Sequence, residues 1–126
     1  MSDITIIGSN VPSTSTKVPL AFHVGEDVTV QVTISPVVDI TGWTLVMTAR
    51  LTLGVLPLAF QKSTGGFGIV ITSGPLGVFN ITVASADTSA LAAVEYFYDI
   101  QRTDVGFRHV LVEGMLTLAA MVNPAP

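Results

Sequence analysis

The chain has no cysteine, few charged residues and no long apolar run. The absence of cysteine from its 126 residues excludes disulfides and thiolate metal sites. Charged residues make up 11% of the chain, against about 25% in an average domain, and they form no basic run. A membrane-spanning helix needs about 20 apolar residues, and no apolar stretch of this chain is that long. We therefore expect neither a nucleic acid nor a membrane as partner.

The N-terminus also lacks a targeting signal. Residues Met1 to Ile4 show no basic region followed by an apolar stretch, so we expect no signal peptide. This interpretation places the synthesis of the protein in a cytoplasm.

What the chain has in excess is apolar side chains. Hydrophobic residues make up 49% of the sequence, and a single domain of this size cannot bury so many, because much of its surface is unavoidable. We expect part of the apolar content to face neighbours in an assembly. A monomer whose surface is coated with Thr and Ser is the alternative.

Apolar and polar residues alternate with a period of two along most of the chain. In the segment from Asp27 to Ser35, every second residue is Val or Ile and the intervening ones are Thr or Gln. This pattern is typical of a half-buried β-strand. It predicts that Val30 and Val32 lie in the core.

Turn signals recur every eight to twelve residues or so, as expected of a β-sandwich. We predict an all-β fold, an immunoglobulin-like antiparallel β-sandwich of about 7–9 strands. The Ala-rich stretch from Ala84 to Ala93 predicts one short helical crossing between the sheets near residues 85–92. Trp43 and Tyr98 are expected in the core. Tyr96 is expected to form a tyrosine corner, with its hydroxyl bonded to a backbone group near residues 87–91.

Three segments follow from this pattern. Residues 1–22 are predicted to form an N-terminal strand and an extended arm, residues 23–122 the sandwich, and residues 123–126 a Pro-rich tail. Gly114 is a candidate bulge or bend in the last strand.

The sequence offers no catalytic, metal or cofactor site. His23 and His109 are far apart and sit between apolar neighbours, so we interpret both as structural or surface residues. No G-x-S-x-G nucleophile elbow is present. We therefore expect no catalytic residues and no cofactor.

The few charged residues indicate where the chain could contact other subunits. Several gather around the last hairpin, among them Asp99, Arg102 and Arg108, while Arg50 stands alone on its strand. All four are candidate interface residues. Arg50 and Asp99 could form a cross-strand pair within the chain or a salt bridge between subunits. By alternation Phe97 faces away from the core and is a candidate interface anchor.

The order of these elements resembles a known family. The similarity rests on Gly25 to Asp27, Asp39 to Trp43, Gly77 to Ile81, Asp87-Thr88 with Leu91, Tyr96 to Ile100 and Glu113 to Thr117. Together these segments resemble the small immunoglobulin-like virion proteins of tailed bacteriophages. The first half is similar to the N-terminal domain of phage baseplate upper proteins, in which a D-x-T-G turn follows the second strand. The similarity spans residues 20 to 120.

The resemblance implies a non-enzymatic structural part of a virion, such as a capsid decoration, a neck or tail adaptor, or a baseplate component. Its partners would be copies of itself and other virion proteins, after synthesis in the host bacterial cytoplasm. A carbohydrate- or surface-binding immunoglobulin-like module is the alternative. Such a module requires an exposed aromatic groove with convergent polar groups.

Overall fold

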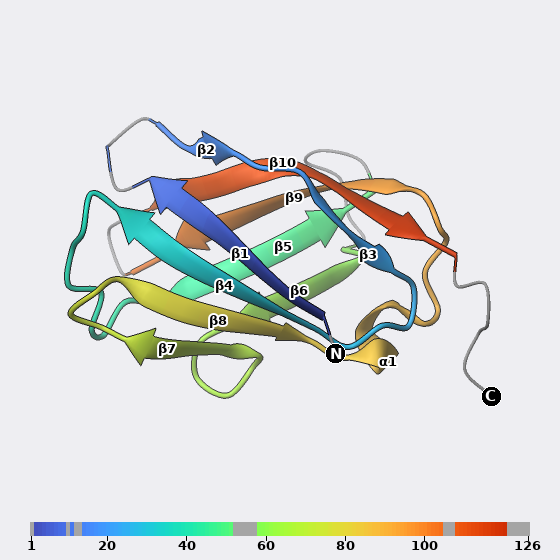
Figure 1. The fold of residues 1–126 in the computed structure, drawn as a ribbon, viewed down its shortest axis with the longest axis horizontal. Coiled ribbons are helices and arrows are strands. Elements are labelled where there is room, and N and C mark those ends of the chain that lie inside the picture. Colours follow the sequence, from blue (N-terminus) through green and yellow to red (C-terminus); the bar gives the residue numbers. More distant parts are fainter. Residues whose placement is uncertain (1, 10, 12–13, 52–57, 105–107, 121–126) are drawn as a thin grey trace.

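The chain folds into two β-sheets that pack face to face (Figure 1). The computed structural model describes residues 2–9, 11, 14–51, 58–104 and 108–120. The four-stranded sheet contains, in spatial order, β1 (Ser2–Ser9), β4 (Val28–Ser35), β8 (Val78–Val83) and β7 (Ile69–Ser73). The six-stranded sheet contains β2 (Thr16–Lys17), β10 (His109–Ala119), β9 (Glu95–Arg102), β5 (Leu45–Arg50) and β6 (Phe60–Ser63), and β3 (Leu20–His23) also pairs with β10. The predicted all-β sandwich is confirmed, with ten described strands in place of the seven to nine expected.

The sheets are mixed, which differs from the antiparallel pairing predicted for the sandwich. Strand β1 runs parallel to β4, and both β2 and β3 run parallel to β10. None of these three pairings can be closed by a hairpin, because parallel neighbours require a crossover connection. Between β1 and β4 the chain crosses to the other sheet as β2 and β3 and then returns (Figure 1).

This crossover builds the start of the chain into the sandwich. The predicted boundary between residues 22 and 23 falls within β3, and each of β1, β2 and β3 pairs with a strand of one of the two sheets. The predicted tail at 123–126 lies outside the described residues.

Gly114 has a different role from the predicted bulge. The register shift in β10 lies between Val110 and Val112, away from Gly114. At Gly114 the link between β2 and β3 runs alongside β10, and a Cβ there would collide with the carbonyl oxygen of Val18. The same carbonyl accepts a hydrogen bond of 2.6 Å from the Tyr98 hydroxyl. The glycine therefore permits the close approach by which the crossover is held on the sheet.

The core forms between the inner faces of the two sheets. Val30 and Val32 are fully buried, as predicted, and Tyr96 and Tyr98 are buried on the facing sheet. Trp43 is partly buried and packs against the core from its margin. It precedes the first paired residue of β5 and packs at the end of the sheet, with the Arg102 guanidinium 4.0 Å from its ring centroid.

The helical crossing falls where the sequence predicts it. Helix α1 (Ser85–Thr88) leads from β8 in one sheet towards β9 in the other. The Tyr96 hydroxyl donates to the Ala92 carbonyl at 2.9 Å. The predicted tyrosine corner is therefore present, with its acceptor one residue beyond the expected range.

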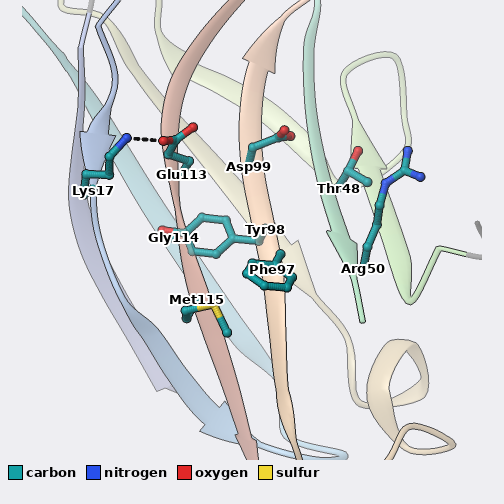
Figure 2. A pocket seen from close by; sticks show the side chains of 9 residues that line it. All are labelled: Lys17, Thr48, Arg50, Phe97, Tyr98, Asp99, Glu113, Gly114 and Met115. Atoms are coloured by element: carbon teal, nitrogen blue, oxygen red, sulfur yellow. Dashed lines mark hydrogen bonds and ion pairs between the residues drawn. The ribbon is translucent and has the colours of Figure 1, made fainter. Parts of the chain in front are cut away.

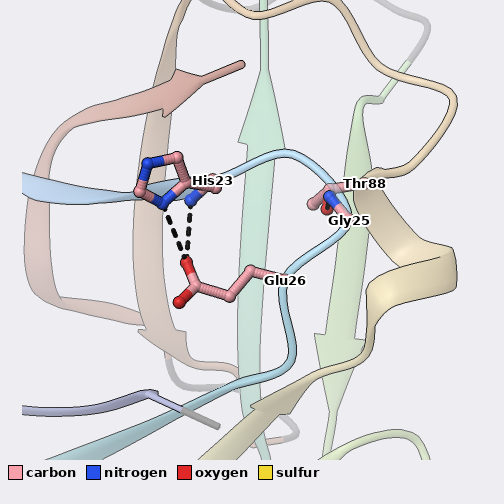
Figure 3. Close-up of polar contacts among 4 residues, drawn as sticks. All are labelled: His23, Gly25, Glu26 and Thr88. Atoms are coloured by element: carbon pink, nitrogen blue, oxygen red, sulfur yellow. Dashed lines mark hydrogen bonds and ion pairs between the residues drawn. The ribbon is translucent and has the colours of Figure 1, made fainter. Parts of the chain in front are cut away.

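Side-chain and backbone contacts join α1 to the turn between β3 and β4 (Figure 3). The N–H of Gly25 donates to the Thr88 hydroxyl at 2.8 Å, and Thr88 is fully buried. In the same turn, the Glu26 carboxylate accepts from the backbone N–H of His23 at 2.9 Å and lies 3.4 Å from its imidazole Nδ1. His23 thus contributes to the turn structure, and the Nε2 of His109 lies 3.0 Å from the Ser9 carbonyl oxygen.

We expect Thr88→Val to destabilise the fold by about 1–2 kcal/mol, because the isosteric side chain leaves the Gly25 N–H without an acceptor. Thr88→Ser keeps the hydroxyl and should lose less. Chemical denaturation of the two variants and the wild type checks this expectation. An equal loss in both variants would show that packing of the methyl group, not the hydrogen bond, is what matters.

Candidate docking surfaces

Charge is distributed unequally between the two sheets. Strands β4, β7 and β8 of the four-stranded sheet carry no charged residue, and β1 carries one, Asp3, near its start. The strands of the six-stranded sheet, by contrast, carry Lys17, Arg50, Lys62, Glu95, Asp99, Arg102 and Glu113. The outward side chains described on the four-stranded sheet, apart from Ser9 and Ser35 at the ends of β1 and β4, are Thr5, Ile7, Thr29, Gln31, Thr33, Val70, Thr72, Val78, Asn80 and Thr82. We refer to these ten residues as the uncharged face.

Strand β7 forms one edge of the four-stranded sheet, and β8 is its only partner among the described strands (Figure 1). Large apolar side chains are exposed along this edge: Val70 on the strand is 62% exposed, and Phe67 and Leu76 in the flanking turns are 69% and 62% exposed. A register shift between Ile71 and Ser73 limits the regular pairing of β7 with β8 to the first residues of β7. We refer to β7 with Phe67 and Leu76 as the β7 edge.

The other three edges are charged or covered within the described residues. Strand β6 carries Lys62, which is ion-paired with Asp87 at 2.6 Å, and β2 carries the exposed Lys17. Along β1, the Ile7 carbonyl accepts from the Thr16 hydroxyl and the Ser9 carbonyl is bonded by His109. Charged side chains, especially lysine, normally protect edge strands from pairing with another chain. The β7 edge has no such protection.

A second surface is a pocket of about 470 Å³ on the outer face of the six-stranded sheet (Figure 2). Its apolar part comes from Phe97, Tyr98, Gly114 and Met115. Its polar part comes from Lys17, Thr48, Arg50, Asp99 and Glu113. The strand pairing of β10, β9 and β5 places these side chains together, since Asp99 lies opposite both Glu113 and Thr48, and Phe97 lies opposite both Met115 and Arg50.

Three of the five interface residues predicted from the sequence meet in this pocket: Phe97, Arg50 and Asp99. Phe97 does point away from the core, as alternation predicts. Arg102 does not line the pocket, because it stacks on Trp43 and its Nε lies 2.6 Å from the Asp104 carboxylate. Arg108 is exposed and does not line it either, although its charge acts on Asp99.

Lys17 and Met115 are pocket residues that the sequence interpretation missed. Met115 could have been found by alternation from Glu113 along the last strand. Lys17 could not, because it reaches the pocket only through the parallel pairing of β2 with β10.

Asp99 is the pocket residue whose carboxylate has incomplete hydrogen bonding and a shifted pKa. Its Oδ2 accepts a hydrogen bond of 2.9 Å from Gln101 Nε2, whereas its Oδ1 is buried and has no hydrogen-bond partner. Burial raises the pKa of Asp99, and the neighbouring Glu113 carboxylate raises it further. The Gln101 hydrogen bond and the charges of Arg50 and Arg108 lower the pKa without cancelling the effect of burial. A carboxylate with an unsatisfied oxygen is therefore held next to a second carboxylate.

The described residues were also inspected for metal sites and membrane-spanning helices. Within it, no three His, Cys, Asp or Glu side chains lie close enough together to hold a metal ion. None of its helices has the length and apolarity to cross a membrane.

Comparison with known proteins identifies the class of fold. No protein-family model matches the chain, and a search of curated proteins found no match. Among solved structures, the N-terminal domain of phage TP901-1 ORF48 is similar with a TM-score of 0.52 and 9% identity, covering 94% of this chain and 99% of that one. Auracyanin A, a blue copper protein of Chloroflexus aurantiacus, gives a TM-score of 0.47 at 13% identity, covering 92% and 98%. The chain thus shares its β-sandwich fold, distantly, with a phage domain.

We expect Asp99→Asn to stabilise the protein at neutral pH. Because the folded-state pKa is raised, ionisation of Asp99 costs more in the folded than in the unfolded state, so its contribution to stability falls as the pH rises through the pKa. Thermal melts of variant and wild type should differ at pH 7 and converge near pH 3, where Asp99 is protonated in both states. A difference that does not depend on pH would contradict this account.

Proposed function

We propose that the protein is a non-enzymatic structural component of a bacteriophage particle that acts by self-association and by docking on other virion proteins. A capsid decoration or cement protein, a neck protein, and a tail or baseplate adaptor are the roles that fit this description. The observation that carries the proposal is the combination of the uncharged face with the unprotected β7 edge.

The physical argument starts from composition. A chain with 49% hydrophobic and 11% charged residues cannot bury all its apolar side chains. The structure shows where the excess lies, since Ile7 and Val70 are more than half exposed on the uncharged face, and Phe67 and Leu76 extend the apolar surface beside β7. Exposed apolar surface of this kind is typical of protein interfaces.

The edge supplies the second part of the argument. The free side of a terminal strand presents backbone donors and acceptors that pair with a strand of another chain. On β7 no charged side chain opposes such pairing. The net charge of −4 is carried by other parts of the chain, so two copies can approach at this edge without bringing like charges together there.

The likeness to the phage ORF48 domain supports the proposal through the fold, and the sequence resemblance to phage virion proteins agrees with it. A carbohydrate- or surface-binding module is the second candidate. One observation favours it: the pocket places the Phe97 ring beside polar side chains, as a sugar site requires. Glycan-array binding that is lost in Phe97→Ala would support this second function, and silence on the array would eliminate it.

Val70→Lys tests the main proposal, because a lysine on the edge opposes pairing with another chain. We expect the wild type to form oligomers whose size increases with concentration, and the variant to associate about tenfold more weakly, a change of about 1.4 kcal/mol. Light scattering coupled to size-exclusion chromatography measures both. Since Val70 is exposed, the stability of the fold should change by no more than about 0.5 kcal/mol.

Gln61→Lys is the matched control, since it adds the same charge on β6, an edge that already carries a lysine. It should associate as the wild type does. Mass spectrometry of purified particles provides the second measurement. A wild-type chain that stays monomeric at all concentrations and is absent from particles would overturn the proposal.

A further inference from the structure

We propose that β7 joins two copies of this chain into a closed dimer, in which the two β7 strands lie antiparallel about a two-fold axis at Val70. The two four-stranded sheets then form one continuous sheet, with both uncharged faces on the same side. This inference rests on the proposed function. It names the partner of the β7 edge and the geometry of the contact.

The open side of β7 presents the backbone groups of Ile69 and Ile71. Just before the strand, the carbonyl oxygen of Gly68 accepts a hydrogen bond from the N–H of Thr82 on β8 at 2.8 Å. In an antiparallel ladder, the residues that bond a given neighbour alternate along the strand. Val70 therefore directs its N–H and C=O towards β8, whereas Ile69 and Ile71 direct theirs to the side on which a second chain can pair.

The regular part of β7 determines the register of the contact. The pairing of β7 with β8 is regular from Ile69 to Ile71 and shifts before Ser73. Such a shift bends the strand, so a second chain finds regular backbone only along the first residues. An antiparallel copy centred on Val70 uses all of them, because Ile69 of each copy then exchanges hydrogen bonds with Ile71 of the other. The two Val70 residues face each other as a non-hydrogen-bonded pair, with Cα atoms about 4.5 Å apart.

Exposed apolar side chains at both ends of β7 are placed to meet in this dimer. Phe67 precedes the strand and Leu76 follows it, and both are more than half exposed. Antiparallel pairing of identical strands brings the start of one beside the end of the other, so each Phe67 approaches Leu76 of the second copy. The equally exposed Val70 meets its equivalent between them. The β7 edge is therefore complementary to itself, as a two-fold contact requires.

The charges around β7 also favour a second copy as the partner. Strands β7 and β8 carry no charged residue, so two copies bring no like charges together along these strands. Lys62 lies against Gly68 at the start of β7, but its ammonium group is ion-paired with Asp87 at 2.6 Å. Among the other described edges, β2 carries the exposed Lys17, and β1 is covered by side-chain hydrogen bonds. The β7 strand of another copy is the edge that β7 fits best.

Val70→Cys tests the register, because the chain has no cysteine of its own. Two cysteines on the axis have a Cα separation within the range of about 4.4–6.8 Å that a disulfide requires. Thr72→Cys is the matched control on the same exposed face of the strand. Its position lies opposite Gly68 of the second copy, which separates the two control cysteines by roughly 13 Å along the strands. In a glutathione buffer, non-reducing gels should show covalent dimer forming at least about tenfold faster for Val70→Cys than for the control.

A distance measurement tests the continuous sheet without altering the contact. Gln31 is exposed on β4 and lies opposite Asn80, which in turn lies opposite Val70. In the dimer, the two Gln31 positions are five strand spacings of about 4.8 Å apart, or about 24 Å. Double electron–electron resonance between nitroxide labels on Gln31→Cys should give a distance near this value, broadened by the label arms and the sheet twist. Adding Val70→Lys should remove that distance.

The possible outcomes separate this inference from the proposed function. The dimer requires both signals, the preferential cross-link of Val70→Cys and the Gln31 distance. Association in light scattering without both of them would refute the β7 dimer and leave a structural role through another surface in place. Faster cross-linking of the Thr72 variant would refute the register centred on Val70. A chain that stays monomeric at all concentrations also refutes the dimer, and its absence from purified particles is the separate result that counts against the virion role.

Discussion

The rest of the molecule depends on the apolar contact between its two sheets. No disulfide crosses this contact, so the sheets are held together mainly by side-chain packing, with hydrogen bonds from Thr16 and His109 to carbonyls of β1 at one margin. On β4 every second side chain, including Val30 and Val32, is fully buried against the other sheet, where Met47 and Ile100 are equally buried. Since side chains alternate along a strand, committing one face to the core fixes which residues face outward. The packing therefore determines the two outer surfaces as well as the fold.

Those outer surfaces differ in character. Charged side chains gather on the six-stranded sheet, while the four-stranded sheet presents the uncharged face and ends at the β7 edge. A sandwich with one surface of each kind can meet two neighbours by different means. On the proposed function, apolar contact and strand pairing with a neighbour would use the uncharged face and the β7 edge. This division suits a protein that is built into an assembly.

One residue of the pocket, Asp99, is an unfavourable choice for the stability of the fold. Asp99 is held at a position where burial and the adjacent Glu113 oppose its ionisation. Gln101 satisfies only one of its oxygens. An apolar or amide side chain would fit the sheet at lower cost, and local departures from the most stable choice are typical of binding sites. The surrounding core, which is fully packed beneath the sheet, supplies the stability that this arrangement requires.

The sequence by itself determined the strands, the buried positions Val30 and Val32, the helical crossing and the Tyr96 hydrogen bond, because alternation and turn chemistry are local. It also placed Phe97, Arg50 and Asp99 on outward positions that proved to share one surface. Only the tertiary structure decided the parallel pairings, the partial exposure of Trp43, the closeness of Lys17 to Glu113 and the need for glycine at position 114. These features arise where segments far apart in sequence meet, and strand order and register depend on the packing of the whole chain rather than on any local pattern.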